Sequence, residues 1–244
     1  MTRIVFFWVG PDVTVPSYLV KSLALFPDSD REIVQLTDQE TPAIEGVTRV
    51  VRNRLSKNIM VARLESYAAV SIDERFSFFC DADLLFLDRL QLTAAPARDI
   101  LIMRRPNNML VKSHFPEHYP EFDGKTFLEV MPFLFGGIAV RNAAGFFPEL
   151  LQICMRLPER FHRWYGDQVS LFEAYKLNPT AFGFLDSRVY QFPMKGVASP
   201  AELLSLRGSG VQVIHFKGSQ YKTLMEPTYR NLAEAVRARA ERKD

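Results

Sequence analysis

Two aspartates stand two positions apart at the end of an apolar run. Asp81 and Asp83 directly follow the segment Phe76–Cys80, which is apolar except for Ser77. If this segment is a buried strand, side chains two positions apart point the same way, so both carboxylates converge on one point. Like charges held close together repel, and a divalent cation relieves that repulsion. The pair therefore predicts a site for Mg²⁺ or Mn²⁺; the alternative is a turn whose aspartates cap a helix.

A histidine near the end of the chain offers a further ligand. His215 lies near the end of the predicted strand Val211–Phe216, which leads into Lys217, Gly218 and, further on, Lys222. An imidazole beside two carboxylates suits Mn²⁺ better than Mg²⁺. Gly218 would let backbone N–H groups approach a phosphate, and either lysine would neutralise its charge. Taken alone, a histidine at the end of a strand also has an ordinary structural interpretation.

Three further groups could contact a ligand. Asp167 and Gln168 open a segment of helical periodicity, where they could grip the hydroxyl groups of a polyol; alternatively, Asp167 is only an N-cap. Gly136 and Gly137 lie at or within an apparent strand, which they weaken unless something must approach the backbone closely. Arg63 lies on the helix that precedes the two aspartates, where an exposed surface arginine is the alternative.

The elements that must position these residues follow an alternating pattern. Short apolar runs alternate with segments of helical periodicity, which is typical of βαβ units and predicts an α/β fold. We expect strands at Ile4–Val9, Glu32–Leu36, Thr48–Val51, Phe76–Cys80, Ile100–Met103, Phe133–Val140 and Val211–Phe216. We expect helices at Val15–Phe26, Ile59–Val70, Ala144–Arg156, Gln168–Tyr175 and Tyr229–Lys243.

Composition limits the classes of protein that fit. The chain has 244 residues, 48% of them hydrophobic, which is ample for one large domain. Its 30 basic and 28 acidic side chains nearly balance, so we expect no nucleic-acid partner. We expect Cys80 and Cys154 to be buried, reduced thiols. The apolar run Ile4–Val9 is short for a signal peptide, and no run reaches the roughly 20 residues of a membrane span, so we expect a soluble, cytoplasmic protein.

In their order along the chain, these motifs resemble those of the GT-A fold glycosyltransferases, especially the family 8-like group of glycogenin and the bacterial galactosyltransferases. Members of that group have a first βα unit that binds a nucleoside and a helix that carries Arg or Lys. A strand ending in D-x-D, an N-S-G strand, a G-D-Q helix start and a late H-x-x-G-x-x-K follow. The matching residues here are Arg63, Asp81-Ala82-Asp83, Gly136-Gly137, Gly166-Asp167-Gln168 and His215-Phe216-Lys217-Gly218. Each motif is short, and only the ordered set, from about residue 3 to 222, is specific.

The resemblance implies a single GT-A domain over residues 1–244, with a mixed central sheet flanked by helices. Residues 1–90 would form the nucleotide-binding half, residues 91–225 the acceptor-side half with the metal and phosphate loop, and residues 226–244 a C-terminal helix. The implied enzyme transfers a sugar from a nucleotide-sugar donor, a UDP-hexose, to a glycan, glycolipid or protein acceptor. The G-D-Q motif favours retention of configuration.

The resemblance also implies a role for each matched residue. Asp81, Asp83 and His215 would ligate Mn²⁺ or Mg²⁺, and Asp167 and Gln168 would be catalytic, on the reacting face of the sugar. The implied donor contacts are Val9, Tyr18, Thr37, Asp38, Arg63, Ala82, Gly136, Gly137, Lys217, Gly218 and Lys222.

Two departures from the family pattern stand out. Tyr221 occupies the position where the family has lysine, and Lys222 follows it, so either Lys217 or Lys222 could take the phosphate contact. Gly136 and Gly137 replace Asn-Ser-Gly, which removes an amide that would hold the sugar.

Two other functions compete with sugar transfer. Haloacid-dehalogenase-like phosphatases also have a strand followed by D-x-D, but on their first strand, and usually with Thr or Val at the position that Leu85 occupies here. A GT-A domain that binds a nucleotide or glycan without catalysis would be expected to have lost its D-x-D, which is intact.

Two segments have no assigned partner. We expect the irregular stretch Arg104–Lys125 to line the acceptor side or to act as a lid. His114 and His118 have the spacing of a helical metal pair, but the prolines within and after this interval interrupt a helix, so we expect no metal there. The C-terminal segment Tyr229–Asp244 is basic and amphipathic; a capping helix is the favoured interpretation, and weak contact with a membrane surface is the alternative.

Overall fold

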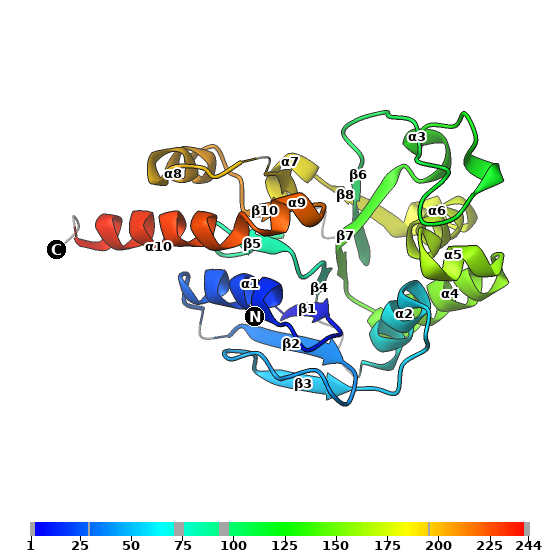
Figure 1. Ribbon diagram of the computed structural model, residues 1–244, viewed down its shortest axis with the longest axis horizontal. Helices are drawn as coiled ribbons and strands as arrows, with labels where there is room; N and C mark the ends of the chain where they lie inside the picture. Colours follow the sequence, from blue (N-terminus) through cyan, green and yellow to red (C-terminus); the bar gives the residue numbers. More distant parts are fainter. Residues whose placement is uncertain (1–2, 29, 71–75, 93–97, 195, 242–244) are drawn as a thin grey trace.

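The computed structural model describes residues 3–28, 30–70, 76–92, 98–194 and 196–241 (Figure 1). Seven strands form the main sheet in the order β3-β2-β1-β4-β7-β6-β8. Their bounds are β1 Arg3–Phe7, β2 Glu32–Thr37, β3 Arg49–Arg52, β4 Ser77–Cys80, β6 Ile100–Arg104, β7 Phe133–Val140 and β8 Phe182–Leu185. Strands β1 to β4 are parallel, β7 is antiparallel to both of its neighbours, and β6 and β8 are parallel to each other. The predicted mixed central sheet is therefore confirmed.

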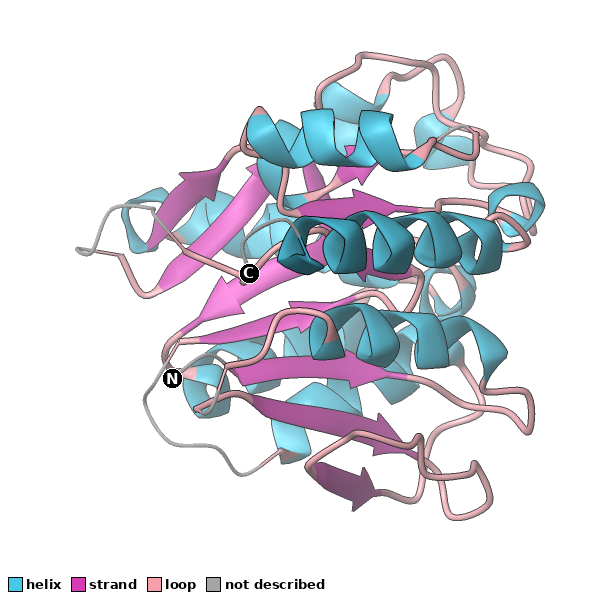
Figure 2. Ribbon diagram, turned by 90° about the vertical axis from the view of Figure 1, so that its left-hand side faces the viewer, coloured by secondary structure: helices cyan, strands magenta, loops and turns pink. Residues whose placement is uncertain are grey.

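The main sheet is buried on both faces because apolar side chains occupy successive positions of its strands. In β1, Ile4 and Phe6 belong to one core and Val5 and Phe7 to the other. Helices α2 (Ile59–Ala69), α4 (Ala143–Arg156) and α6 (Gly166–Leu177) supply side chains to one core, and α1 (Thr14–Ala24) supplies them to the other. Figure 2 shows the strands enclosed between helices.

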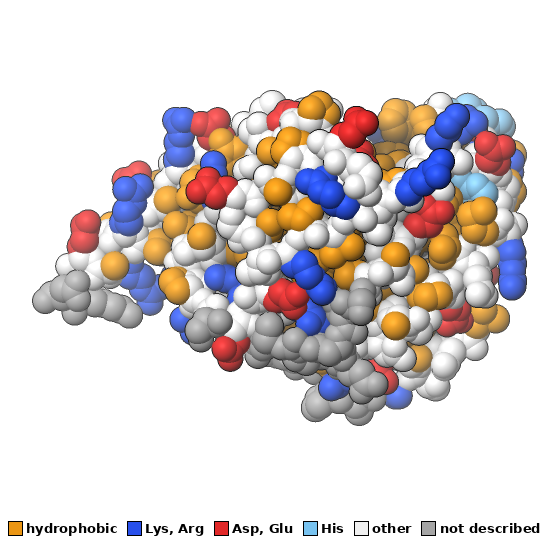
Figure 3. All heavy atoms as spheres, turned by 90° about the horizontal axis from the view of Figure 1, so that it is seen from below, with side chains coloured by type: hydrophobic (Ala, Val, Ile, Leu, Met, Phe, Trp, Pro, Cys, Tyr) orange, Lys and Arg blue, Asp and Glu red, His pale blue; other side chains and the backbone are white. Residues whose placement is uncertain are grey.

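A second, three-stranded sheet lies beside α1. Its order is β5-β10-β9, formed by Leu84–Phe86, Val213–His215 and Phe192–Pro193. Helices α8 (Pro200–Gly208) and α10 (Met225–Glu241) pack against it and against each other. The remaining short helices are α3 Phe127–Val130, α5 Glu159–Arg163, α7 Ser187–Tyr190 and α9 Ser219–Lys222, with 3₁₀ turns at Pro120–Phe122 and Pro179–Ala181. On the face shown in Figure 3, basic, acidic and apolar side chains are interspersed.

The observed elements agree with most of the predicted ones. The first strand ends at Phe7 rather than Val9, and β5, β8, β9 and α8 were not predicted. The C-terminal helix begins at Met225; its predicted last residues Arg242 and Lys243, like Asp244, lie outside the described residues. Cys80 and Cys154 are buried free thiols, as predicted. Among the described helices, none combines the length and apolarity that a membrane span requires.

The strand order of the main sheet reverses at β1. The chain passes from β1 to β2 and β3 on one side of β1 and then returns to form β4 on the other. In open α/β sheets, ligands bind beyond the carboxyl ends of the strands at such a reversal. Thr37 is the last residue of β2, Asp81 directly follows β4, and Val9 lies two residues after β1. All three therefore lie along the edge formed by the carboxyl ends of these strands.

Candidate active site

Two carboxylates and an imidazole meet where the main sheet joins the small sheet. His215 Nε2 lies 3.2 Å from Asp83 Oδ1 and 3.7 Å from Asp81 Oδ2. One ligand atom from each of the three residues fits within 4.8 Å of the others. The predicted convergence is therefore confirmed in the structure.

The convergence has a different cause from the predicted strand alternation. Strand β4 ends at Cys80, so both aspartates lie in the bend between β4 and β5. Asp81 N–H donates to the carbonyl of Gly136 (3.1 Å), and Phe216 N–H donates to the carbonyl of Asp83 (3.0 Å). Because Leu84 also pairs with His215 across the small sheet, the imidazole is held opposite the aspartates.

Each carboxylate of this cluster has a cationic neighbour. Lys222 Nζ lies 3.3 Å from Asp83 Oδ2, and Arg63 Nη1 lies 2.8 Å from Asp81 Oδ1. Burial acts to raise the pKa of Asp83, but the hydrogen bond and charge of His215 and the charge of Lys222 outweigh it and lower that pKa. The Asp83 carboxylate therefore stays ionised and can attract a cation in place of these neighbours.

Arg63 of α2 connects the aspartate cluster to α6. Its guanidinium forms ion pairs with Asp81 and with Asp167, whose side chain is fully buried, and it lies over the ring of Phe135 at 4.8 Å. A guanidinium is planar and has several N–H donors, so it can pair with two carboxylates while its face stacks on an aromatic ring. Arg63 is therefore part of the site and not the exposed surface arginine of the alternative interpretation.

The start of α6 brings a carboxamide to the same region. Asp167 Oδ1 accepts from the N–H of Gln168 (2.7 Å), and Gln168 Oε1 accepts from the guanidinium of Arg105. Arg105 also donates to the carbonyl of Met131 (2.7 Å), and burial lowers its pKa to about 10. Arg105 was not predicted, because an arginine after an apolar strand has no local signal that separates it from a surface residue.

Both candidate lysines lie near the cluster. Desolvation, followed by the charge of Arg105, lowers the pKa of Lys217, although the residue is exposed to solvent. Gly218 adopts φ 99°, which favours glycine, and turns the chain so that Lys222 points to Asp83 while Tyr221 packs into the core.

The two glycines of β7 face opposite sides. A Cβ at Gly136 would overlap the carboxamide of Gln191 and lie 2.7 Å from Asp81 Oδ2, so this glycine borders the site. A Cβ at Gly137 would lie 2.7 Å from both Met103 Cε and Phe78 Cζ. Alternation along the strand therefore turns the side-chain position of Gly137 into the core, where glycine makes room for packing, and its predicted contact with a donor stays a prediction.

The residues predicted to hold the base and ribose make contacts with their own neighbours in the fold. Val9 and Asp38 follow β1 and β2; Thr37 Oγ1 donates to the carbonyl of Trp8 (2.7 Å), and the Asp38 carboxylate accepts from Thr41 N–H (2.7 Å). Tyr18 lies 5.7 Å from the ring of Tyr229 in the interface between α1 and α10. The remaining predicted donor contact, Ala82, is buried between the two aspartates. Thus no described contact joins Tyr18 to the aspartate cluster.

The segment Arg104–Lys125 is anchored to α5 and α6 by an aromatic cluster. This cluster consists of Val111, Tyr119, Phe122, Met131, Phe161, Tyr165 and Val169. Tyr119 Oη donates to the carbonyl of Arg160 (3.1 Å), and Tyr165 Oη donates to that of Lys112 (3.3 Å). These contacts pack the segment against α5 and the start of α6, and its role as an acceptor wall or a lid stays a prediction.

The two histidines of this segment lie side by side on the surface. His114 and His118 pair as strand neighbours, and their rings stack with centroids 4.3 Å apart and planes at 11°. Asp123 lies 2.9 Å from His118 Nε2, and all three residues are exposed. A metal ion lies in the plane of each imidazole that binds it, and two stacked, nearly parallel planes share no such point. One ligand atom from each of His114, His118 and Asp123 nevertheless lies within 4.8 Å of the others, so the expectation of no metal here stays a prediction.

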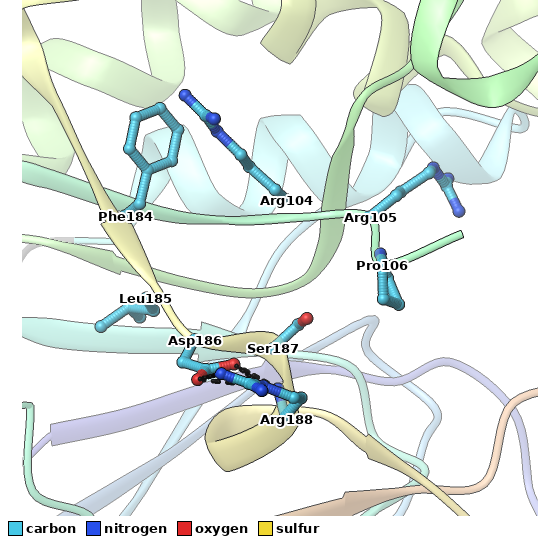
Figure 4. Close-up of a pocket in the computed structure, with 8 residues that line it drawn as sticks. All are labelled: Arg104, Arg105, Pro106, Phe184, Leu185, Asp186, Ser187 and Arg188. Carbon is cyan, nitrogen blue, oxygen red and sulfur yellow. Dashed lines mark hydrogen bonds and ion pairs between the residues drawn. The ribbon is translucent and has the colours of Figure 1, made fainter. Parts of the chain in front are cut away.

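A cavity lies on the acceptor side of the predicted division. It has a volume of about 250 Å³ and is lined by Arg104, Arg105, Pro106, Phe184, Leu185, Asp186, Ser187 and Arg188. Figure 4 shows Arg104 beside Phe184, with its guanidinium 4.0 Å from the ring centre, and Arg188 paired with Asp186, while Arg105 points away from them. Since Arg105 also contacts Gln168, the cavity adjoins the site.

The architecture is shared with solved glycosyltransferases. The glycosyltransferase GlyE of Streptococcus pneumoniae TIGR4 has a TM-score of 0.57 at 12% identity, over 100% of this chain and 65% of GlyE. The galactosyltransferase LgtC, solved with donor and acceptor sugar analogues, has a TM-score of 0.55 at 14% identity, over 96% of this chain and 95% of LgtC. The chain has the GT-A fold. A glycosyltransferase involved in glycosylation of the major capsid of PBCV-1 also shares it, with a TM-score of 0.50 at 10% identity, over 92% of this chain and 98% of that one.

The comparisons confirm the resemblance inferred from the motifs at the level of the GT-A fold. No family model matches the sequence, and no curated protein matches it. The chain spans 65% of the length of GlyE.

Proposed function

We propose that the protein is a metal-dependent glycosyltransferase that moves a hexose from a UDP-linked donor to a glycan, glycolipid or protein acceptor, with retention of configuration. The observation that carries this proposal is the convergence of Asp81, Asp83 and His215 at the switch point of a GT-A fold. Arg63, Lys217 and Lys222 place positive charge around that cluster. Clustered carboxylates flanked by cations suit a bound metal together with a diphosphate.

The donor set fits a divalent cation. Two carboxylates and one imidazole suit Mn²⁺ and are acceptable to Mg²⁺, so Asp81, Asp83 and His215 would hold the ion. When bound, the ion supplies Lewis-acid stabilisation of charge on the diphosphate leaving group. Lys222 now pairs with Asp83, and we infer that it moves its ammonium to the phosphate when the donor binds.

The other residues bind and orient the sugar. Lys217, accessible yet surrounded by protein, would neutralise the second phosphate. Asp167 is fully buried and held in place by Arg63, and Gln168 is held by Arg105, so both side chains are fixed before a donor binds. Such preorganisation lowers the reorganisation required in the transition state.

We assign the acceptor to the cavity of Figure 4. Its wall includes Arg105, which links it to Gln168, and its other residues follow β6 and β8 at the same edge of the sheet as Asp81. No observation of the site favours the phosphatase or the non-catalytic alternative. The proposed division of one domain into a nucleotide half and an acceptor half keeps β4 on one side and β6 and β7 on the other, within a single sheet.

The test is release of UDP from a panel of UDP-hexoses, measured with and without Mn²⁺ and with and without glycan acceptors. We expect Mn²⁺-dependent release in the native protein and its loss in Asp83→Asn. Asp123→Asn is the matched control, because this aspartate also lies beside a histidine but outside the site. If no UDP-hexose binds or reacts, or if Asp83→Asn remains fully active, the proposed function is wrong.

A further inference from the structure

A buried carboxamide beside the aspartate cluster has no structural explanation. Gln191 follows α7 and immediately precedes β9, and it is only 5% exposed. Its Oε1 is shielded from solvent and accepts no hydrogen bond from any described residue. A buried acceptor without a partner costs about 1–3 kcal/mol, so such groups are rare unless something outside the chain satisfies them.

The surroundings of Gln191 place this amide inside the site. Its Nε2 occupies the space that a side chain at position 136 would fill, and Asp81 Oδ2 borders the same space. Only glycine at position 136 leaves room for both groups. Gln191 lies 55 positions beyond Gly136 and outside any short motif, so no local pattern in the sequence marks it.

A second buried glutamine shows what a structural carboxamide looks like in this fold. Gln35 of β2 is fully buried, and it uses both ends of its amide: Nε2 donates to the carbonyl of Pro42 (2.9 Å), and Oε1 accepts from the N–H of Ile44 (2.9 Å). Gln191 has the same chemistry and nearly the same burial, but its oxygen is unused. The difference separates a residue that holds the chain together from one that awaits a ligand.

We propose that Gln191 is a donor-sugar contact that sets which hexose the site accepts, an inference that rests on the proposed function. A ligand hydroxyl both donates and accepts, so one hydroxyl can satisfy the free Oε1 and the adjacent N–H₂ group. A diphosphate offers acceptors only and leaves Oε1 unsatisfied. The partner of Gln191 is therefore a hydroxyl of the sugar and not the phosphates.

The role of Gln191 predicts opposite effects on stability and on binding. In the free protein, Gln191→Met removes an unsatisfied acceptor, so the melting temperature stays the same or rises. Gln35→Met, the matched control, leaves a backbone N–H and a carbonyl unpaired and lowers the melting temperature by several degrees. A merely structural Gln191 would behave like Gln35.

The binding experiment compares Mn²⁺ alone, UDP with Mn²⁺, and two C4-epimeric UDP-hexoses with Mn²⁺. For Gln191→Met we expect unchanged affinity for Mn²⁺ and UDP. The affinity for the preferred UDP-hexose should fall about tenfold, the size of one lost hydrogen bond, and the preference between the epimers should shrink. Gln191→Asn, which keeps the amide but withdraws it by one methylene, should show the same loss.

The outcomes separate this inference from the proposed function. If the native protein binds no UDP or UDP-hexose, the proposed function fails. If it does bind them and Gln191→Met keeps both its sugar affinity and its epimer preference, the inference about Gln191 is wrong while the proposed function stands. A loss of Mn²⁺ or UDP binding equal to the loss of hexose binding would overturn the sugar assignment as well.

Discussion

At the scale of single residues, the buried Asp167 makes Arg63 a structural as well as a functional residue. Its carboxylate is fully buried and its charge is compensated by the Arg63 guanidinium. We expect Arg63→Met to destabilise the fold by about 3–5 kcal/mol, since it leaves that carboxylate without a partner. In the double variant Arg63→Met/Asp167→Asn, the cost should be smaller, because no charge remains buried. Urea unfolding of the native protein, Arg63→Met, Asp167→Asn and the double variant measures these losses of stability. Strictly additive effects of the two single changes would contradict the prediction.

The ligands of the metal cluster should not contribute equally. A neutral imidazole supplies less charge to a hard cation than a carboxylate, so His215→Ala should weaken Mn²⁺ binding less than Asp81→Asn or Asp83→Asn. Titration calorimetry with Mn²⁺ measures the order. Equal losses in all three variants, or no effect of His215→Ala, would show that the ligand set is wrong. Arg63 and Lys222 already compensate the charges of Asp81 and Asp83. We therefore do not expect replacement of either aspartate to stabilise the fold by relieving repulsion.

At the scale of elements, two adjacent glycines of strand β7 face different surroundings: Gly136 faces the site and Gly137 faces the core. Gly137→Ala would press on Phe78 and Met103 in the core, so we expect a loss of about 1–3 kcal/mol of stability. Gly136→Ala meets the flexible end of Gln191 and the carboxylate of Asp81, so it should reduce donor binding far more than stability. Thermal unfolding and donor titration of both variants provide the comparison. The reverse pattern would mean that the two faces of β7 are wrongly assigned.

Helix α10 uses its apolar stripe within the protein. Leu232 is buried, and Tyr229 and Val236 pack against the same cluster, which leaves a solvated face with Arg237 and Arg239. We therefore expect neither the native protein nor Arg237→Glu/Arg239→Glu to sediment with phosphatidylserine vesicles. Charge reversal is a cleaner test than truncation, which would remove core side chains. Sedimentation of the native protein that is lost in the double variant would support membrane contact.

At the scale of the whole molecule, donor binding should stabilise the folded state by mass action. A ligand at 100 times its Kd contributes about 2.7 kcal/mol. We expect UDP and Mn²⁺ together to raise the melting temperature more than the sum of their separate effects, because the ion and the diphosphate would share the cluster of Asp81 and Asp83. Differential scanning fluorimetry measures this. Additive shifts would indicate separate sites for the ion and the nucleotide.

Local sequence signals predicted the main sheet well and the small sheet poorly. Strands such as Phe133–Val140 are long apolar runs, whereas Leu84–Phe86 and Phe192–Pro193 are too short to have a period of their own. Helix α8 had a usable signal, the capping box of Ser199 and Glu202. The short strands of the small sheet form only by pairing with strands distant in the chain. The periodicity of a single segment does not show which distant segment it will pair with.

The amino-acid sequence by itself determined the α/β class, the strand that leads to Asp81 and Asp83, and the ordered motifs. These depend on contiguous residues, whose burial pattern and spacing are local properties. Only the tertiary structure decided that Gly136 faces the site and Gly137 the core, and that Arg105 and Gln191 join it. Those placements depend on how β7 pairs with β4 and β6, because contacts between residues far apart in the chain arise only when the sheet has formed.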